Sequence, residues 1–140
     1  MKMFKRSILI FVVCVVMLSL SSCVTSNDYN IEISCDQFTE SNHCSSDVLM
    51  EVGDKIILTL CSNPSTGFSW EYEVTTANVV KEEGHDFEEP EEGLVGAPGK
   101  ELWTFEAVER GNTEIQMEYS RPWEGGTKAE WTYIIKVTVE

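Results

Sequence analysis

The sequence predicts an all-β domain, an antiparallel β-sandwich of about seven or eight strands. From residue 31 onward, apolar and polar residues alternate in short runs, which is the two-residue period of a strand with unlike faces. Turn-forming Gly, Pro, Asn and Ser residues separate these runs. No segment shows a sustained apolar period of 3.6 residues, and there is no internal repeat or second domain. One apolar face per strand fits two sheets that share a core.

The first 22 residues form a segment of a different kind. Positive charges precede an apolar run at residues 8–18, and small residues follow it. This order is typical of a secretory signal peptide. The run would extend only about 16 Å as a helix, against about 30 Å of hydrocarbon, so a stable transmembrane span is the weaker interpretation.

The end of this segment is more specific. Leu20-Ser21-Ser22-Cys23 resembles a prokaryotic lipobox, in which the cysteine becomes the lipidated first residue. Acyl chains on Cys23 would anchor the protein to a membrane, whereas an ordinary secretory signal is the alternative. We therefore expect a signal peptide at 1–22, a tether at 23–30 and a β domain at 31–140. The protein would be extracytoplasmic, secreted and held at a membrane as a lipoprotein.

The chain is strongly acidic. Its net charge of −14 becomes −17 once the three positive charges of Lys2, Lys5 and Arg6 are removed with the leader. This charge argues against a nucleic-acid partner and against attraction to an anionic membrane surface. Much of it lies in residues 82–92, which we interpret as a solvated loop, with steering of a basic partner as the alternative.

The cysteines and histidines limit the chemistry. An extracytoplasmic compartment permits disulfides, and Cys35 and Cys44 bracket a polar segment that a bond between them would close. Cys61 follows a strand-like run and is expected to be a buried thiol. His43 beside Cys44 has no companion at metal-ligand spacing, so we expect no metal and no cofactor. Neither His43 nor His85 lies in a nucleophile motif, so we expect no enzyme.

The strand-like runs follow one another with short gaps. Ile56, Leu58 and Leu60 alternate with polar or exposed positions, and Trp70, Trp103 and Trp131 occupy alternating positions expected to face the core. Residues 110–112 are predicted to form a hairpin turn. The runs lie at 29–33, 48–52, 55–61, 68–74, 78–81, 100–107, 113–119 and 129–140.

Three loops have compositions beyond simple turns. Proline fixes φ, glycine permits a left-handed turn, and small side chains let a stiff tip enter a narrow slot. An exposed tryptophan beside proline has no core to serve, which indicates a partner. The loops are 63–68 (Asn63, Pro64, Ser65, Thr66, Gly67 and Phe68), 93–99 (with Gly96, Ala97, Pro98 and Gly99) and 120–126 (with Arg121, Pro122 and Trp123).

These loops, in this order and each followed by a strand, resemble the signature of the chagasin family of inhibitors of papain-like cysteine peptidases. The resemblance covers residues 48–140 and implies an immunoglobulin-like sandwich with the three loops at one end. It further implies reversible, competitive inhibition. Thr66 would face the catalytic Cys and His of the peptidase, the main chain of 96–99 would lie on one wall of the cleft, and Trp123 would cover the other side.

Some features depart from the family pattern. Pro98 stands where many members carry Gly, and Ser65 stands where Thr is common. The segment 35–44 and the acidic run lie outside the pattern, which leaves the choice of target open. The competing hypothesis is a lipid-anchored surface module that binds carbohydrate or another protein. The conjunction of three loops favours the inhibitor, which we expect to be monomeric.

Overall fold

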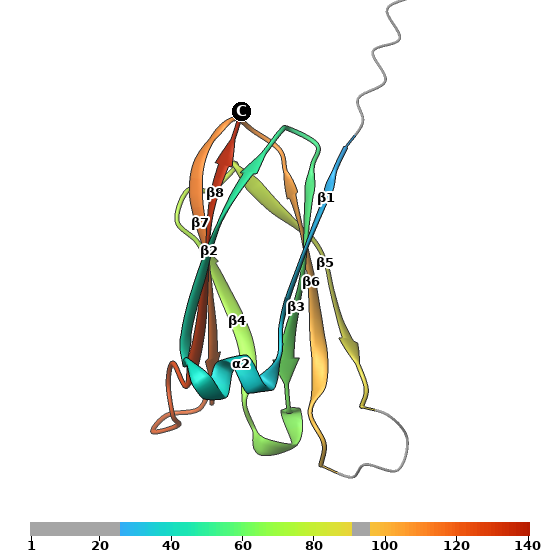
Figure 1. The fold of residues 1–140 in the computed structure, drawn as a ribbon. Coiled ribbons are helices and arrows are strands. Elements are labelled where there is room, and N and C mark those ends of the chain that lie inside the picture. The colour runs from blue at the N-terminus through green and yellow to red at the C-terminus, as the bar shows by residue number, and fades with distance from the viewer. Residues whose placement is uncertain (1–25, 91–95) are drawn as a thin grey trace, which may run out of the picture.

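The computed structural model describes residues 26–90 and 96–140 as two sheets that face one another (Figure 1). One sheet has the order β1-β3-β6-β5 and the other β2-β8-β7-β4. This architecture confirms the predicted sandwich. The strands of the first sheet are β1 (Asp28–Ile33), β3 (Lys55–Ser62), β6 (Gly99–Ala107) and β5 (Val80–Glu88), and those of the second are β2 (His43–Met50), β8 (Trp131–Val139), β7 (Gly111–Ser120) and β4 (Ser69–Val74).

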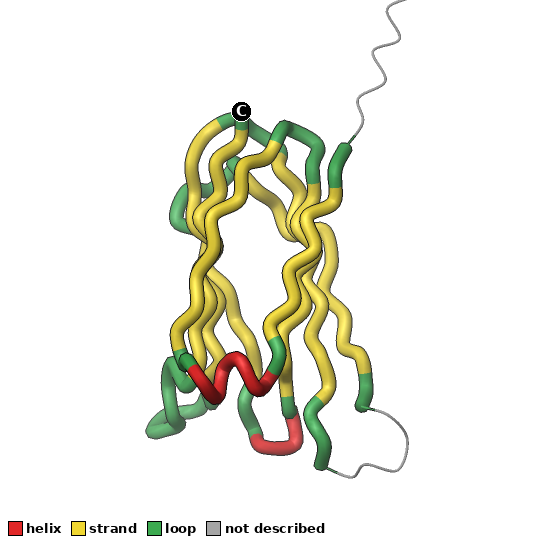
Figure 2. Tube along the Cα trace, in the orientation of Figure 1, coloured by secondary structure: helices red, strands yellow, loops and turns green. Residues whose placement is uncertain are grey.

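The strand pairings are mixed rather than purely antiparallel. Four pairs are antiparallel, but β1 runs parallel to β3 and β2 runs parallel to β8. Helix α2 (Cys35–Glu40) follows β1 and carries the chain from the first sheet to the second (Figure 2). β1 and β2 thus close the same side of the sandwich, each as the outer strand of its sheet.

The core lies between the two sheets, where the alternation predicts it. Ile56, Leu58 and Phe105 from one sheet and Ile115 and Ile135 from the other are fully buried. Of the three tryptophans expected inside, Trp70 and Trp103 are buried and Trp131 is partly buried against the core.

The acidic run differs from its prediction. Residues 80–88 form β5, a long outer strand, whereas the sequence suggested a strand only at 78–81 followed by a solvated loop. The pairing with β6 shifts register between Glu82 and Gly84, which marks a bulge. Charges and bulges protect an exposed sheet edge from pairing with other chains. The many acidic residues of this edge strand therefore made it resemble a solvated loop in the sequence. Residues 91–92 lie outside the described residues.

Helix α2 was not predicted, because six residues with one buried side chain give no visible period. Ser34 and Gln37 cap it reciprocally: the Gln37 N–H donates to Ser34 Oγ (3.3 Å) and the Ser34 N–H donates to Gln37 Oε1 (2.9 Å). The buried side chain is Phe38. The predicted hairpin at 110–112 is also wrong, because β6 and β7 belong to different sheets and this connection crosses between them.

The disulfide joins Cys35 to Cys61 and not to Cys44, so Cys61 is bonded rather than the free buried thiol that the sequence suggested. Cys35 begins α2 beside the end of β3, with 5.2 Å between the α-carbons of Cys35 and Cys61. Cys44 lies on β2 in the opposite sheet and is a free thiol. Crossing from one sheet to the other separates two cysteines that are close in sequence.

Among residues 26–90 and 96–140, no helix has the length and apolar character needed to cross a membrane. The same residues contain no group of three or more His, Cys, Asp or Glu side chains placed to hold a metal ion. The leader, the lipobox-like segment with Cys23, and residues 93–95 of the second loop lie outside the described residues.

Candidate functional site

The three loops singled out in the sequence lie at one end of the sandwich, the end where α2 also crosses (Figures 1 and 2). Their described parts are residues 63–68, 96–99 and 120–126, which we call the rim. Residues 63–68 connect β3 to β4, residues 96–99 lead into β6, and residues 120–126 lie between β7 and β8. The strand order places their ends beside one another at this pole.

The 63–68 loop is stiffened by its own hydrogen bonds. Pro64–Thr66 form a single turn of 3-10 helix, and Gly67 ends it in the left-handed region at φ 82°. The Gly67 N–H donates to Pro64 O (3.0 Å) and the Thr66 N–H to Asn63 O (3.1 Å). The side chains of Ser65 and Thr66 also donate, to Asn63 Oδ1 (2.5 Å) and Asn63 O (2.6 Å). A proline and a glycine at the positions that need them account for this turn.

The first residue of this loop and the end of β3 before it are fixed to the sandwich. The Asn63 N–H donates to the phenol oxygen of Tyr119 (2.8 Å), and the Trp70 indole N–H donates to Cys61 O (2.9 Å). Tyr119 and Trp70 are both buried. The loop therefore rises from a rigid base.

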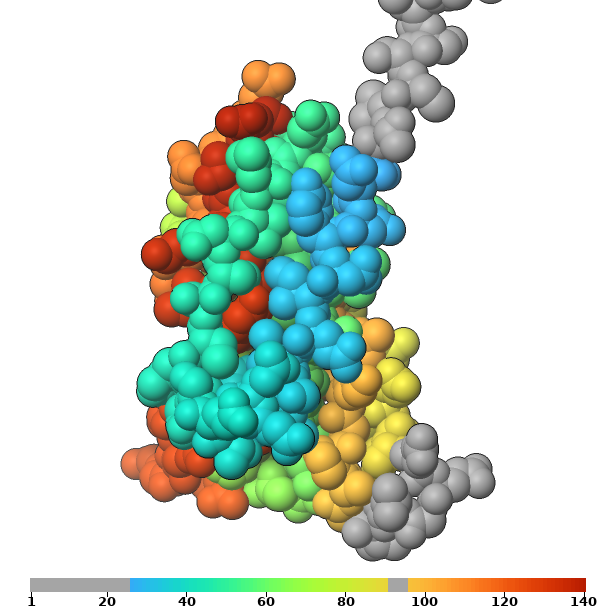
Figure 3. Space-filling model, viewed as in Figure 1, coloured from blue at the N-terminus to red at the C-terminus, as the bar shows by residue number. Residues whose placement is uncertain are grey.

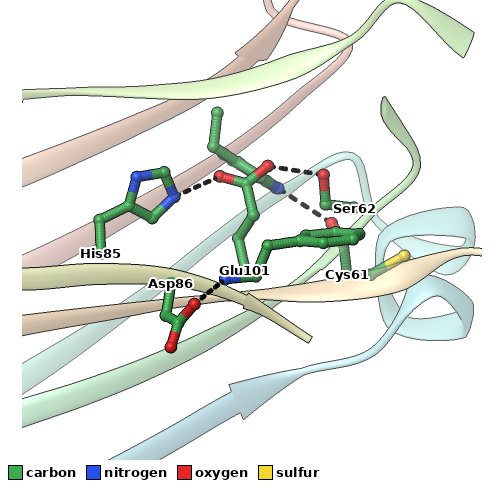
Figure 4. Close-up of polar contacts among 7 residues, drawn as sticks. Cys61, Ser62, His85, Asp86 and Glu101 are labelled. Atoms are coloured by element: carbon green, nitrogen blue, oxygen red, sulfur yellow. Dashed lines mark hydrogen bonds and ion pairs between the residues drawn. The ribbon is translucent and has the colours of Figure 1, made fainter. Parts of the chain in front are cut away.

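A buried carboxylate supports the same base (Figure 4). Glu101 is 6% exposed and accepts hydrogen bonds from Ser62 Oγ at 2.6 Å and from His85 Nε2 at 2.9 Å. The His85 ring stacks on Trp103, with centroids 3.5 Å apart. Glu101 thus links β6, just after the second loop, to the last residue of β3 and to β5. Sequence reasoning missed it, because a single acid in an alternating strand gives no signal of burial.

Hydrogen bonds join the 63–68 loop to both neighbouring loops. Asn63 Nδ2 donates to Gly96 O (2.9 Å) on one side. Arg121 Nε donates to Thr66 O (3.3 Å) on the other. The central loop therefore holds the outer two in place, and the three form one continuous surface.

Trp123 lies on this surface rather than in the core, as the sequence predicts. Its side chain is 51% exposed and packs against Gly67, where a β-carbon would stand 2.5 Å from Cη2. The Arg121 guanidinium lies 4.5 Å from the centroid of the Phe68 ring and 5.9 Å from that of Trp123. Cation–π contacts of this kind hold the third loop over the first.

The described loop residues divide into exposed and packed ones. Pro64, Ser65, Thr66, Gly96, Pro98, Pro122 and Trp123 are exposed, and Ala97 is partly so. Gly99 is buried and pairs with Ser62 at the start of β6. A β-carbon there would lie 2.4 Å from Glu88 O and 2.6 Å from Phe87 Cζ, so this glycine serves packing rather than the surface.

Comparison with known proteins decides the family. The family described as chagasin family peptidase inhibitor I42 matches residues 50–137. The chain belongs to the chagasin family. It is a family of inhibitors and not of enzymes, in agreement with the expectation from the histidines.

Two curated relatives of this family resemble the chain in sequence. Amoebiasin-2 of Entamoeba histolytica is 36% identical over 79 residues, which cover 52% of this chain and 60% of that protein. Chagasin of Trypanosoma cruzi is 31% identical over 87 residues, 59% of this chain and 79% of that protein. The chain thus matches less than two thirds of the length of amoebiasin-2.

Solved structures show that the fold is shared. The cysteine protease inhibitor EhICP2 from Entamoeba histolytica gives a TM-score of 0.65 at 24% identity, over 82% of this chain and 97% of the other. PbICP-C, solved in complex with falcipain-2, gives 0.56 at 17% identity, over 82% and 100%. The sandwich of the chagasin family is therefore the fold of this chain.

Proposed function

We propose that this protein is a reversible, competitive inhibitor of papain-like cysteine peptidases, and that its rim occupies the active-site cleft. The observation that carries the proposal is the hydrogen-bonded continuity of the rim, from Gly96 through Asn63 and Thr66 to Arg121. Membership of the chagasin family supplies the class of partner. The solved complex of a structural neighbour, PbICP-C, with falcipain-2 supports it.

The rim is suited to a narrow cleft with a thiol at its base. Pro64, Ser65 and Thr66 form an exposed tip with no long side chain. A loop fixed before binding loses little entropy on docking, so more of the contact free energy remains as affinity. The proposed inhibition needs no covalent step. The side chains of Ser65 and Thr66 offer hydrogen bonds, and the loop is a rigid turn rather than an open, flexible segment that presents a peptide bond for cleavage.

The hydroxyl of Thr66 is oriented by its own loop. Its proton goes to Asn63 O, so its oxygen remains free to accept a hydrogen bond. We propose that this oxygen accepts from a donor at the catalytic centre, such as the histidine. Trp123, exposed and held by Gly67 and Arg121, would add the apolar contact on the opposite side.

We also propose that Cys23 carries a lipid anchor and that the protein is a monomer outside the cytoplasm. The Asn27 N–H donates to Asp54 Oδ1 (2.7 Å) and the Lys55 N–H donates to Asn27 O (2.9 Å), which fastens the first described residues beside the β2–β3 turn. Figure 1 shows this point at the pole opposite the rim. An anchor on this side would leave the rim facing away from the membrane, open to a peptidase.

Titration of active papain with the purified protein tests the inhibitor proposal. We expect activity to fall with added protein and to recover when the substrate concentration is raised, as competition requires. Cathepsin-type enzymes of the same class extend the panel. Full activity at micromolar protein against every member would refute the proposal and favour a surface module that binds carbohydrate or another protein.

A further inference from the structure

The segment that contains α2 lies before the region that the family model matches. The family match begins at residue 50, after β1, α2 and nearly all of β2. Yet α2 lies at the rim end of the sandwich, beside the loops (Figure 3). From this position, the helix contacts the base of the rim through Cys35 and Phe38.

Phe38 of α2 completes an aromatic layer beneath the 63–68 loop. Its side chain is fully buried, and its ring stacks on Trp131 with centroids 5.0 Å apart and 7° between the planes. The Phe38 ring also packs on Trp70, with ring centroids 5.3 Å apart. Trp131 and Trp70 in turn pack on Tyr119, with ring centroids 4.8 and 5.0 Å from that of Tyr119. Tyr119 is the residue that holds the main chain of the loop.

The disulfide connects α2 to the same base through a covalent bond. Cys61 lies two residues before Asn63, and its own carbonyl accepts the Trp70 indole N–H. Cys35 and Phe38 therefore reach the base of the loop by two routes, one through Cys61 and one through the aromatic layer. Neither residue is part of the exposed tip, Pro64–Thr66.

We propose that Cys35 and Phe38 are positioning residues for the 63–68 loop, and that reduction of the Cys35–Cys61 disulfide by small thiols weakens inhibition of the peptidase. This inference rests on the proposed function. A loop with a fixed base enters the cleft already ordered, and a loosened base must be ordered during binding. A thiol-rich environment, which keeps the catalytic cysteine of the peptidase reduced and therefore active, would then also weaken its inhibitor.

The reduction consumes two equivalents of thiol. A thiolate attacks the sulfur of Cys35, which is partly exposed, forms a mixed disulfide and releases Cys61 as its thiolate. A second thiolate attacks the sulfur of the small thiol in the mixed disulfide and releases Cys35. Both cysteines take up a proton, and the small thiol leaves as its own disulfide. An open recess of about 270 Å³, lined in part by Cys35, Cys61 and Pro98, gives the attacking thiol access.

The test compares the oxidised and reduced protein against papain that has been activated and then freed of reductant. We expect reduction to raise the inhibition constant by at least about tenfold, equivalent to about 1.4 kcal/mol, through faster dissociation. The free energy of ordering a single backbone residue is of this size. The double variant C35A/C61A should show the raised inhibition constant of the reduced protein, whether or not thiol is present.

Two further variants separate positioning from simple stability. Phe38→Leu keeps an apolar side chain in the layer but loses the ring stacking, and we expect it to weaken inhibition while the protein stays folded. Ile135→Val lowers the melting temperature from within the second sheet and should leave the inhibition constant unchanged. Glu40→Gln on α2 is the matched surface control. All constants are measured well below the melting temperatures.

Amide hydrogen exchange distinguishes a local loss of order in the 63–68 loop from a general loss of stability. In C35A/C61A the amides of Asn63, Thr66 and Gly67 should exchange faster, whereas the amide of Ile135 keeps its protection. Equal inhibition constants and equal loop protection in oxidised, reduced and C35A/C61A protein would overturn the inference. Absence of inhibition by the oxidised wild-type protein would instead refute the proposed function itself.

Discussion

Trp123 packs against Gly67 so closely that no side chain fits between them. A β-carbon on Gly67 would stand 2.5 Å from Cη2 and 3.2 Å from Cζ3 of the indole. Gly67 also has a φ of 82°, where a residue with a β-carbon is strained. The place of the exposed indole on the rim therefore depends on a glycine in another loop.

The substitution Gly67→Ala should displace Trp123 and weaken inhibition by about tenfold or more, because hot-spot contacts depend on close packing. We expect the free energy of unfolding to fall by about 1–2 kcal/mol from the left-handed backbone alone. Gly53→Ala is the matched control: its φ is 97°, it lies in the β2–β3 turn far from the rim, and no atom beyond its own residue and its two chain neighbours lies within 4 Å of its β-carbon position. Gly53→Ala should lose stability and keep full inhibition.

Trp123→Ala should remove the largest contact of the rim. We expect the inhibition constant to rise by about 30-fold, equivalent to about 2 kcal/mol for a tryptophan hot spot, with little change in melting temperature. Leu49→Ala controls for loss of an exposed apolar side chain, since Leu49 is 57% exposed on β2. Equal inhibition by wild type and Trp123→Ala would contradict the assignment of the third loop to the interface.

Thr66→Ala tests the tip of the central loop. The Thr66 hydroxyl stabilises its turn through Asn63 O and offers an acceptor to the peptidase. We expect weaker inhibition by about tenfold, from about 1 kcal/mol for one hydrogen bond and part of the turn order. Thr66→Ser, which keeps the hydroxyl, should restore most of the affinity. Failure of Thr66→Ser to differ from Thr66→Ala would assign the loss to the methyl group instead.

The sequence predicted those parts of the fold in which side-chain burial follows strand period. Ile56, Leu58 and Leu60 alternate and are buried, and the exposed Trp123 follows proline in a loop with no apolar partner nearby. These are local signals, because one strand or one turn determines each of them. The three loops were recognisable for the same reason.

The parts that were missed depend on contacts between distant segments. Cys35 pairs with Cys61 because α2 crosses at the end of β3, and no local spacing records that crossing. Glu101 is buried because Ser62 and His85 approach it from two other strands. The acidic run becomes β5 because β6 offers it a free edge, although its own composition favours solvent.

Glu101→Ala should reduce the free energy of unfolding by roughly 1–3 kcal/mol, because it leaves the buried hydroxyl of Ser62 without its acceptor. Chemical denaturation measures the loss. Glu106→Ala, on the same strand but with a partly exposed side chain, is the matched control and should change stability by less than about 0.5 kcal/mol. Equal stability of the two variants would show that the Glu101 carboxylate contributes nothing beyond its bulk.

Tyr133 should make the protein less stable at alkaline pH. Burial raises the pKa of Tyr133 above its ordinary value of 10.0; the hydrogen bond with Ser46 offsets part of this shift, and nearby Cys44 adds a smaller increase. The unfolded chain then loses the phenol proton at lower pH than the folded chain. This contribution to stability is therefore intact below about pH 10 and is lost as pH rises through the pKa of the folded protein.

Tyr133→Phe should make the alkaline decline in unfolding free energy shallower, as measured by denaturation at a series of pH values. At neutral pH it should cost about 1 kcal/mol, because the hydrogen bond from the phenol to Ser46 Oγ (2.7 Å) is lost. The decline should not vanish, since burial and Glu82 raise the pKa of Tyr72 as well. Tyr72→Phe should therefore remove a separate share, and an unchanged slope in Tyr133→Phe would show that this phenol ionises no later in the folded protein than in the unfolded chain.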